Sequence, residues 1–379
     1  MKDPRHDRLA ELVLDHSLAL EPGRVLRIDA NAVAAPLILP LHRGAIERGV
    51  HAYATLSLSG LTELLVAHGS DEQISFVSPM ALREIDTIDA AITIWSETNT
   101  RSFSRADPER RQKQLAARRQ VALRGQERIS RGELRWCGTL CPTDAHAQDA
   151  DLSLADYEDF VFRACHVLDD DPVGHWRRIG EELGARAEEL GAVRELRIVG
   201  EDTDLRVVVA DRTWRPAHGL RNLPDGEIYT SPVETGINGT IRFRFPAVFG
   251  GREIDDIRLR FEDGRVVAAQ AGGGEAYLKS LLDLDDGASG VGEIAFGLNY
   301  EIDRFTRNIL FDEKIGGTIH LALGMGFADL GGLNRSALHL DLICDLRRDG
   351  EVYADGELVW QNGRFLREPQ AARTVAHVR

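Results

Sequence analysis

The sequence lacks any apolar run that is long enough to cross a bilayer. Spanning the hydrocarbon core takes ~18 to 20 consecutive apolar residues, and no stretch of the 379 residues approaches that length. The first residues, MKDPRHDRLAEL, also contain no apolar core of the kind that a secretory signal carries. We therefore expect a cytoplasmic protein with no membrane partner.

Positive charge is scarce as well. The chain has 46 Lys and Arg residues against 61 Asp and Glu residues, a formal net charge of −15. Nucleic-acid binding needs a basic surface that neutralises phosphates, so we expect no nucleic-acid partner. An Arg-rich helix predicted over residues 105–131 is interpreted as a solvated face, or as a contact with the protein's own carboxylates.

Cysteine is rare, with four residues at Cys137, Cys141, Cys165 and Cys344. Four are too few for a disulfide framework in a chain of this length, so we expect reduced and mostly buried thiols. The sequence also has no internal repeat, no low-complexity tract, and no G-x-G-x-x-G after its first predicted strand. The last of these absences removes support for a dinucleotide site.

The first half of the chain alternates strand and helix patterns. A strand over residues 24–28 is followed by a helix from about 34 to 48 and a strand over 51–56. These lengths are typical of a βαβ unit with parallel strands. A buried strand over 90–95 extends the same sheet. We predict an α/β N-terminal domain with parallel strands.

After Gly191 the pattern changes to short alternating runs separated by turns, with one clear helix near residues 275–284. Such runs are typical of antiparallel strands. A length of 379 residues also suits two domains better than one. We expect an α/β domain over residues 1–190 and an antiparallel-rich α+β domain over residues 191–379.

Histidine and carboxylate side chains recur in the second half. His339 and Asp341 are two residues apart in an alternating apolar run, and residues two apart on a strand point to the same face. His320 lies in another strand-like run, Glu293 precedes a third, and Glu227 follows a Pro-Asp-Gly turn. Each alone has an ordinary structural explanation. His339 and Asp341, on their shared face, either pair with each other in a buried network or bind a positively charged group.

Four blocks in this half resemble one protein family. They read PDGEIYTSPVETGINGTIRF, VGEIAFG, RNILFDEKIGGTIHLALG and GGLNRSALHLDLICDLR. They are similar to the thermophilic aminopeptidases, also called the aminopeptidase T and aminopeptidase S family. The resemblance extends more weakly into the N-terminal half through CPTDAHAQDADLSLADYEDFVF and DDPVGHW. It implies a dinuclear metallo-exopeptidase that acts on peptides with a free N-terminus and forms a homodimer. By position it implies these metal ligands: Glu227, Glu293, His320, His339 and Asp341.

The charge of these ligands favours two metal ions. Three carboxylates and two neutral imidazoles carry a formal charge of −3, and such a cluster without cations would repel itself. Two divalent ions and one bridging hydroxide bring the charge to zero, and five ligands suit ions about 3.5–4 Å apart. We favour Glu293 as the bridging carboxylate, from the resemblance and from its place in the sequence. Zinc, cobalt and manganese all suit this donor set. Residues 191–379 are then the catalytic metal-binding domain.

This metal pair predicts the release of N-terminal amino acids from peptides. The ions lower the pKa of a shared water near the scissile carbonyl, and one ion can take the free α-amino group. Glu293 and Glu313 are the candidate catalytic residues, and Glu313 would move the proton to the leaving amine. The alternative role for Glu313 is a structural pair with Lys314 or Arg307.

Two alternative functions stay open. The family usually has a tyrosine seven residues after the first metal-binding histidine, where this chain has Phe327. A phenyl ring can neither coordinate a metal nor donate a hydrogen bond, which would suit a catalytically weak or inactive metal-binding protein. The two histidines and Asp341 could instead hold Fe(II), as in ring-cleaving dioxygenases that resemble the same fold family. Those enzymes have no need of the acidic residues Glu227 and Glu293, which favours the hydrolase.

Overall fold

The computed structural model describes residues 3–369. Contacts along the chain divide it into two compact units. The first comprises the chain up to His175 together with Gly219–Pro224, and the second comprises Trp176–His218 and the chain from Asp225 onward. The chain passes from the first unit to the second within α9 (Pro172–Gly191). The boundary near residue 190, inferred from the change of pattern, stays a prediction.

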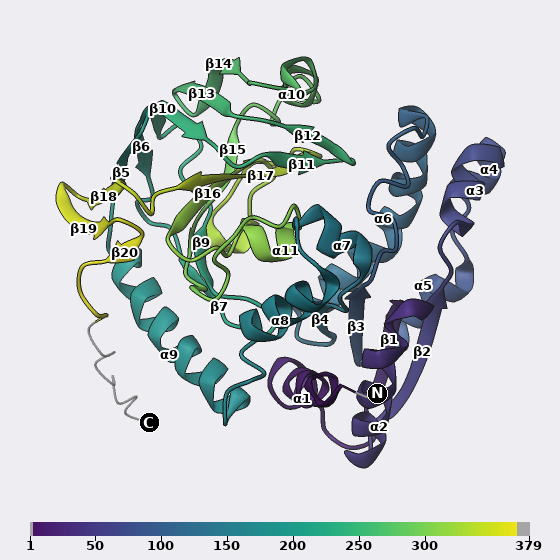
Figure 1. Cartoon of the computed structure of the whole chain (residues 1–379). Helices are drawn as coiled ribbons and strands as arrows, with labels where there is room; N and C mark the ends of the chain where they lie inside the picture. Colours follow the sequence, from purple (N-terminus) through teal and green to yellow (C-terminus); the bar gives the residue numbers. More distant parts are fainter. Residues whose placement is uncertain (1–2, 370–379) are drawn as a thin grey trace. The chain divides into compact units, whose positions relative to one another are not determined.

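The first unit is built around a parallel sheet with the strand order β2-β1-β3-β4-β8. Figure 1 labels β2, β1, β3 and β4 of this sheet. All of its strand pairs are parallel, which confirms the α/β prediction. In β1 the buried residues alternate, with Leu26, Ile28 and Ala30 in the core. The strands are β1 (Val25–Asn31), β2 (His51–Ser57), β3 (Ala90–Trp95), β4 (Arg135–Leu140) and β8 (Asn222–Leu223).

Capping residues mark where the helices of this unit begin. Asp107 accepts hydrogen bonds from the backbone N–H groups of Glu109 and Arg110, and Pro108 occupies the first helical position of α6. Arg110 and Arg128 of this helix donate to backbone carbonyl groups, so part of the Arg-rich stretch packs within its own unit. The helical segments are α1 (Pro4–Leu12), η1 (Val13–Leu18), η2 (Ala32–Ala34), α2 (Ala35–Glu47), α3 (Leu61–His68), α4 (Asp71–Ser75), α5 (Pro79–Thr87), α6 (Pro108–Ser130), α7 (Asp144–Asp149) and α8 (Leu154–Ala164). Across residues 3–369, no helix combines the length and apolar character needed to cross a bilayer.

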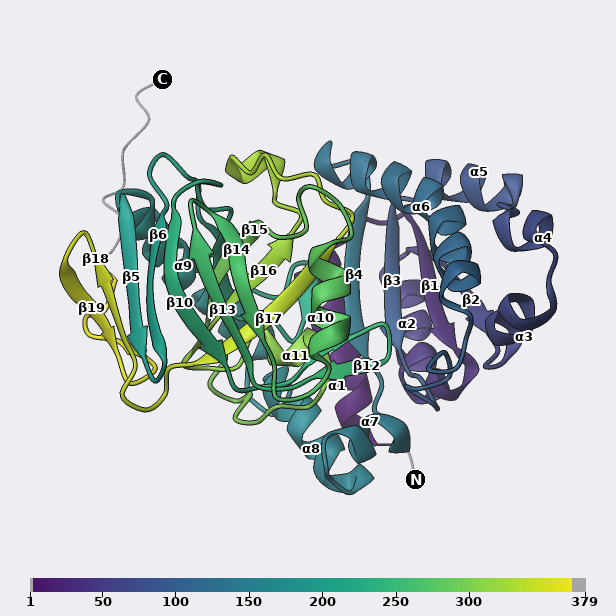
Figure 2. The same cartoon turned by 90° about the horizontal axis from the view of Figure 1, so that it is seen from above.

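The second unit contains two antiparallel sheets and a short hairpin. The larger sheet has the order β14-β13-β10-β6-β5-β18-β19-β20, and the smaller has the order β17-β16-β15-β9-β7. Figure 2 shows β5, β6, β10 and β13 of the larger sheet side by side. The antiparallel pairing agrees with the prediction for this half. The strands are β5 (Glu195–Gly200), β6 (Thr203–Val208), β7 (Arg215–Ala217), β9 (Glu227–Thr230), β10 (Ile237–Phe243), β11 (Ala247–Phe249), β12 (Arg252–Ile254), β13 (Ile257–Glu262), β14 (Arg265–Gln270), β15 (Val291–Gly297), β16 (Thr318–Gly324), β17 (His339–Asp345), β18 (Glu351–Ala354), β19 (Glu357–Gln361) and β20 (Arg364–Phe365). Its helical segments, besides α9, are α10 (Glu275–Leu282), α11 (Ile309–Asp312) and η3 (Ala328–Leu330).

One face of each of these two large sheets contributes to the hydrophobic core of the second unit. Ile198 and Leu205 of the larger sheet belong to the same buried cluster as Ile294, Leu321 and Leu340 of the smaller sheet. Successive residues of a strand point to opposite faces. The residues between these core positions therefore lie on the other face of the smaller sheet, which leaves that face available for polar side chains.

Candidate metal centre

Three adjacent strands of the smaller sheet place four of the predicted ligands on one face. In the register of β15, β16 and β17, Glu293 and Asp341 both lie opposite Ala322. Directly opposed residues on neighbouring strands point to the same face. His320 is two residues before Ala322, and His339 is two residues before Asp341, so these side chains share that face.

Glu227 reaches the same face from β9. It lies opposite Gly297, which is four residues after Glu293 on β15. The preceding Gly226 has a φ of 119°, and a Cβ there would lie 2.9 Å from the Cβ of Asn299. The turn that leads into Glu227 therefore requires glycine. All five predicted ligands are brought together by four neighbouring strands of the second unit.

Backbone carbonyl groups orient both histidine rings. Nδ1 of His320 lies 3.0 Å from the carbonyl oxygen of Glu313, and Nδ1 of His339 lies 3.1 Å from that of Met325. The tautomer with a proton on Nδ1 donates to the carbonyl and leaves Nε2 as the atom that faces the carboxylates. Gly292 allows this arrangement at His339, because a Cβ at position 292 would clash with the Met325 carbonyl group.

Glu293 lies between the two histidines. Its Oε1 is 3.6 Å from Nε2 of His320, and its Oε2 is 3.4 Å from Nε2 of His339. Nε2 of His339 is also 3.4 Å from Oδ1 of Asp341, and Nε2 of His320 is 3.9 Å from Oε2 of Glu227. Each imidazole therefore faces two carboxylates, and one carboxylate is common to both.

The donor atoms fit divalent metal ions. Within residues 3–369, Oε2 of Glu227 and Oδ1 of Asp341 are buried and accept no hydrogen bond. A buried acceptor without a donor costs about 1–3 kcal/mol, and more when it is charged, so such oxygens indicate a cationic ligand. Each histidine also belongs to a group of three donor side chains within 4.8 Å of one another, and Asp341 belongs to both groups. Mixed imidazole and carboxylate donors suit zinc, cobalt or manganese.

The carboxylates hold protons on both imidazole rings. Burial alone would lower the pKa of His320, but Glu293 and Glu227 raise that pKa to about 10. Burial likewise opposes the charge of His339, whose pKa Asp341 and Glu293 raise to about 11. Burial raises the pKa of Glu227 well above its usual value. A metal ion at this centre would have to displace the imidazole protons, so its binding would compete with protonation.

Lys314 is a residue of this site that the sequence suggests only as a possible partner of Glu313. Its side chain is 0% exposed, and its Nζ pairs with the carboxylate of Glu313 and lies 3.7 Å from Oε1 of Glu227. Burial opposes the charge, but Glu227, Glu313 and Asp225 raise the pKa of Lys314, so the ammonium group stays charged. The sequence gives only a weak signal that Lys314 is buried, because Asp312-Glu313-Lys314 looks like an exposed charged turn.

Glu313, the candidate for proton transfer, lies beside the ligands. Its carboxylate pairs with Lys314 and groups with the donor atoms of His320 and Asp341. Burial raises its pKa. The other partner considered for it, Arg307, pairs with Glu253 at 2.9 Å. The structure thus places Glu313 where it can act on a proton, while also showing its pair with Lys314.

Two aromatic residues line the edge of the site. The ring of Phe327 lies 5.9 Å from that of His339 and 5.2 Å from that of Tyr229. Tyr229 is two residues after Glu227 on β9 and shares its face. Burial raises the pKa of Tyr229 to about 12, and the charge of Glu293 acts in the same direction. Tyr229 therefore keeps a protonated hydroxyl at neutral pH, a group that the sequence analysis did not identify.

Comparisons with known proteins point in the same direction. A model of the family described as thermophilic metalloprotease (M29) matches residues 2–365. Aminopeptidase 2 of Geobacillus stearothermophilus is 29% identical over 406 residues, covering 96% of this chain and 98% of that protein. Aminopeptidase T of Thermus aquaticus is 32% identical over 231 residues, covering 52% of this chain and 54% of that protein. The structure of wild-type AmpT from Thermus thermophilus matches with a TM-score of 0.86 and 23% identity, over 96% of this chain and 99% of that chain. The last match shows a shared fold.

Proposed function

Because the chain belongs to the thermophilic metalloprotease (M29) family, we propose that it releases N-terminal amino acids from peptides with two divalent metal ions and a bridging hydroxide. Family membership and the named relatives make the chain a metallo-aminopeptidase, a hydrolase that uses divalent metal. The number of ions and the role of each residue are the substance of the proposal.

Glu293 is the observation that supports two ions best. Its two oxygens face different histidines, at 3.6 Å from His320 and 3.4 Å from His339. A carboxylate in this position can bridge two ions. We assign His339 and Asp341 to one ion and His320 and Glu227 to the other. The formal charge of −3 on the five ligands agrees with two divalent ions and one hydroxide.

Glu313 and Lys314 complete the chemistry that this chain supplies. Divalent ions in such a centre activate water and polarise the scissile carbonyl. Glu313, with its raised pKa, accepts the proton released by that water and donates it to the leaving amine nitrogen. Lys314 is a positioning residue, because its ammonium group holds Glu313 and Glu227 in place.

The same proposal includes the substrate and the form of the enzyme. Peptides with a free N-terminus suit this centre, because one metal ion could take the lone pair of the free α-amino group. Zinc, cobalt and manganese are the candidate ions. A homodimer is proposed from the family resemblance alone. A cytoplasmic location is proposed because no apolar run in the sequence is long enough to cross a bilayer.

The alternative functions make different use of the same residues. An Fe(II) dioxygenase centre needs two histidines and one carboxylate, and Glu293 would then be a surplus acid in contact with both histidines. We therefore favour the hydrolase. Because Phe327 replaces the tyrosine that the family usually has, we expect this enzyme to hydrolyse peptides more slowly. The rate of peptide hydrolysis tests this expectation.

Hydrolysis of a matched pair of peptides tests the proposed activity. The enzyme, loaded with Zn²⁺, Co²⁺ or Mn²⁺, should cleave a short peptide and a set of aminoacyl chromogenic substrates. The N-acetylated twin of the peptide should resist cleavage, because its amide nitrogen has no lone pair to offer a metal. Equal cleavage of both peptides would show that the enzyme is no aminopeptidase.

Metal content tests the bridging role of Glu293. Glu293→Gln should abolish hydrolysis and hold at least one metal equivalent fewer than the wild type. Glu357→Gln is the matched control, because it makes the same chemical change at an exposed residue at the start of β19. Wild-type metal content in Glu293→Gln would contradict the bridge. One tightly held equivalent of iron with no peptide hydrolysis would favour the dioxygenase instead.

A further inference from the structure

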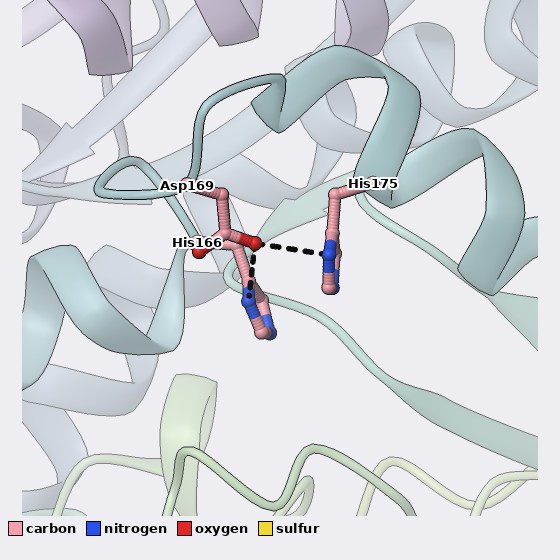
Figure 3. Close-up of side chains that lie close together, drawn as sticks. All are labelled: His166, Asp169 and His175. Carbon is pink, nitrogen blue, oxygen red and sulfur yellow. Dashed lines mark ion pairs between the residues drawn. The ribbon is translucent and has the colours of Figure 1, made fainter.

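Three further side chains with metal-binding atoms meet in the first unit, outside the candidate metal centre. His166 follows α8, His175 lies in the first turns of α9, and Asp169 lies between them in the sequence (Figure 3). Oδ2 of Asp169 is 3.3 Å from Nδ1 of His166 and 2.9 Å from Nδ1 of His175. Figure 3 shows this oxygen directed toward both rings.

The end of α8 fixes the position of His166. The backbone N–H of His166 donates to the Arg163 carbonyl, and that of Val167 donates to the Phe162 carbonyl. This pair of bonds is the Schellman ending of a helix, in which the left-handed position usually belongs to glycine. His166 occupies it with a φ of 56°. The imidazole is therefore held beside the helix end by a backbone conformation that histidine adopts uncommonly.

The start of α9 fixes His175 in a similar way. Asp171 accepts a hydrogen bond from the backbone N–H of Gly174 at 2.9 Å, and its carbonyl accepts one from the N–H of His175. The two rings then stack with their centroids 3.9 Å apart and their planes at 22°. Both Nδ1 atoms turn toward Asp169, so the chain organises the three donor atoms before any ligand arrives.

The spacing of these atoms matches a shared metal ion. Two donors that bind one ion at about 2.0–2.1 Å lie about 2.9 Å apart at right angles and about 3.4 Å apart at the tetrahedral angle. The two observed separations, 2.9 Å and 3.3 Å, fall within this interval. All three side chains are partly exposed, so an ion can reach them from solvent.

The local charge also suits a cation. Asp169, Asp170 and Asp171 are consecutive in the sequence, and the chain as a whole carries a formal charge of −15. The guanidinium of Arg8 donates to the backbone carbonyl of Asp169, whereas the Asp169 carboxylate faces the two histidines. Binding one divalent ion would make the formal charge of the three ligands +1, which the neighbouring carboxylates offset.

We propose that His166, Asp169 and His175 form a second, separate site for a divalent transition-metal ion in the first unit. Two imidazole nitrogens and one carboxylate oxygen favour zinc and its neighbours over magnesium or calcium. The ion would link the end of α8 to the start of α9 and stabilise the turn between them. It would have no part in catalysis, and it does not depend on the proposed function of the second unit.

Zinc content measured after equilibration with free Zn²⁺ tests this site. His166→Gly is the safest variant, because glycine suits the left-handed position and removes the imidazole. His166→Gly and Asp169→Asn should each hold one zinc equivalent fewer than the wild type, with unchanged peptide hydrolysis. Asp170→Asn is the matched control, because it removes the same charge from the adjacent exposed residue, and it should keep the wild-type content.

The comparison between variants separates this site from the metal centre of the second unit. If none of the proteins hydrolyses peptides, that result counts against the proposed function of the second unit only. The difference in zinc content between the variants and the wild type can still be measured. Wild-type zinc content in both His166→Gly and Asp169→Asn would overturn the proposal, and the cluster would then be two stacked imidazoles sharing one carboxylate. An equal loss in Asp170→Asn would also overturn it, by showing that only general negative charge matters.

Discussion

Replacing Lys314 with methionine tests whether buried charges in the metal centre are balanced as the structure indicates. Methionine keeps an aliphatic chain of similar length and removes the ammonium group that pairs with Glu313 and Glu227. Removing one partner of a buried ion pair costs about 3–5 kcal/mol, because the remaining charge is uncompensated. In a unit of about 200 residues, each 1 kcal/mol lowers Tm by about 2–4 °C. The expected decrease is therefore ~6–20 °C.

The size of this loss should depend on metal. Divalent cations beside Glu227 would replace part of the missing positive charge, so Lys314→Met should lose more stability in a chelating buffer than in Zn²⁺. Calorimetry of both proteins in the two buffers measures the difference in Tm. The matched control is Lys279→Met, because Lys279 is 56% exposed and pairs with Glu275 on the surface of α10, where ion pairs contribute little. Equal losses in the two variants, or a loss at Lys314 that Zn²⁺ does not reduce, would refute the reasoning.

Two further changes give distinct results. Phe327→Tyr should raise kcat more than it lowers KM, since a hydrogen-bond donor to the transition state can be worth about 10²–10³ in rate. Steady-state kinetics of both proteins measures the two constants. A wild type that is already fast and gains nothing from the tyrosine would contradict this prediction. Asp312→Asn should flatten the pH dependence of stability. Burial raises the pKa of Asp312 from 3.8 to about 8, so the folded protein retains a proton that the unfolded chain releases, and stability falls by up to about 1.4 kcal/mol per unit as pH rises between these values. Asparagine keeps an acceptor for the two hydrogen bonds from Thr306, and urea unfolding at about pH 5 and about pH 8 should show a smaller difference than in the wild type.

Local sequence patterns were sufficient for those parts of the structure that depend on strand periodicity. The spacing of His339 and Asp341 predicts their shared face, because alternate residues of any strand point the same way. The parallel first half and the antiparallel second half were also predicted, because each pattern extends over many residues. Placing Glu227 and His320 beside them needs the register between strands, which a local pattern does not contain. For these residues the family resemblance provided the grouping.

Lys314, His166 and β8 show what a local pattern cannot reach. The charged run around Lys314 is typical of a surface turn, and its complete burial follows from tertiary packing beside Glu227. His166 takes the left-handed conformation that ends a helix, a position that glycine usually occupies. A histidine there gives no local signal of this conformation. Leu223 of β8 pairs with Thr139 in the parallel sheet of the first unit, although the two are 84 residues apart. Pairing between such distant segments is decided by the whole fold.

The ligand face of the smaller sheet limits how this protein can change in length. The strands β15, β16 and β17 alternate ligand positions with core positions such as Leu340 and Leu342. Deleting one residue within β17 would slip its register and exchange the two faces. Leucine side chains would then point toward the ligands, while a histidine and an aspartate would enter the hydrophobic core. Insertions and deletions in this unit are therefore expected in the segments between the strands. A change of length there leaves the register within each strand, and so the face of each ligand, unchanged.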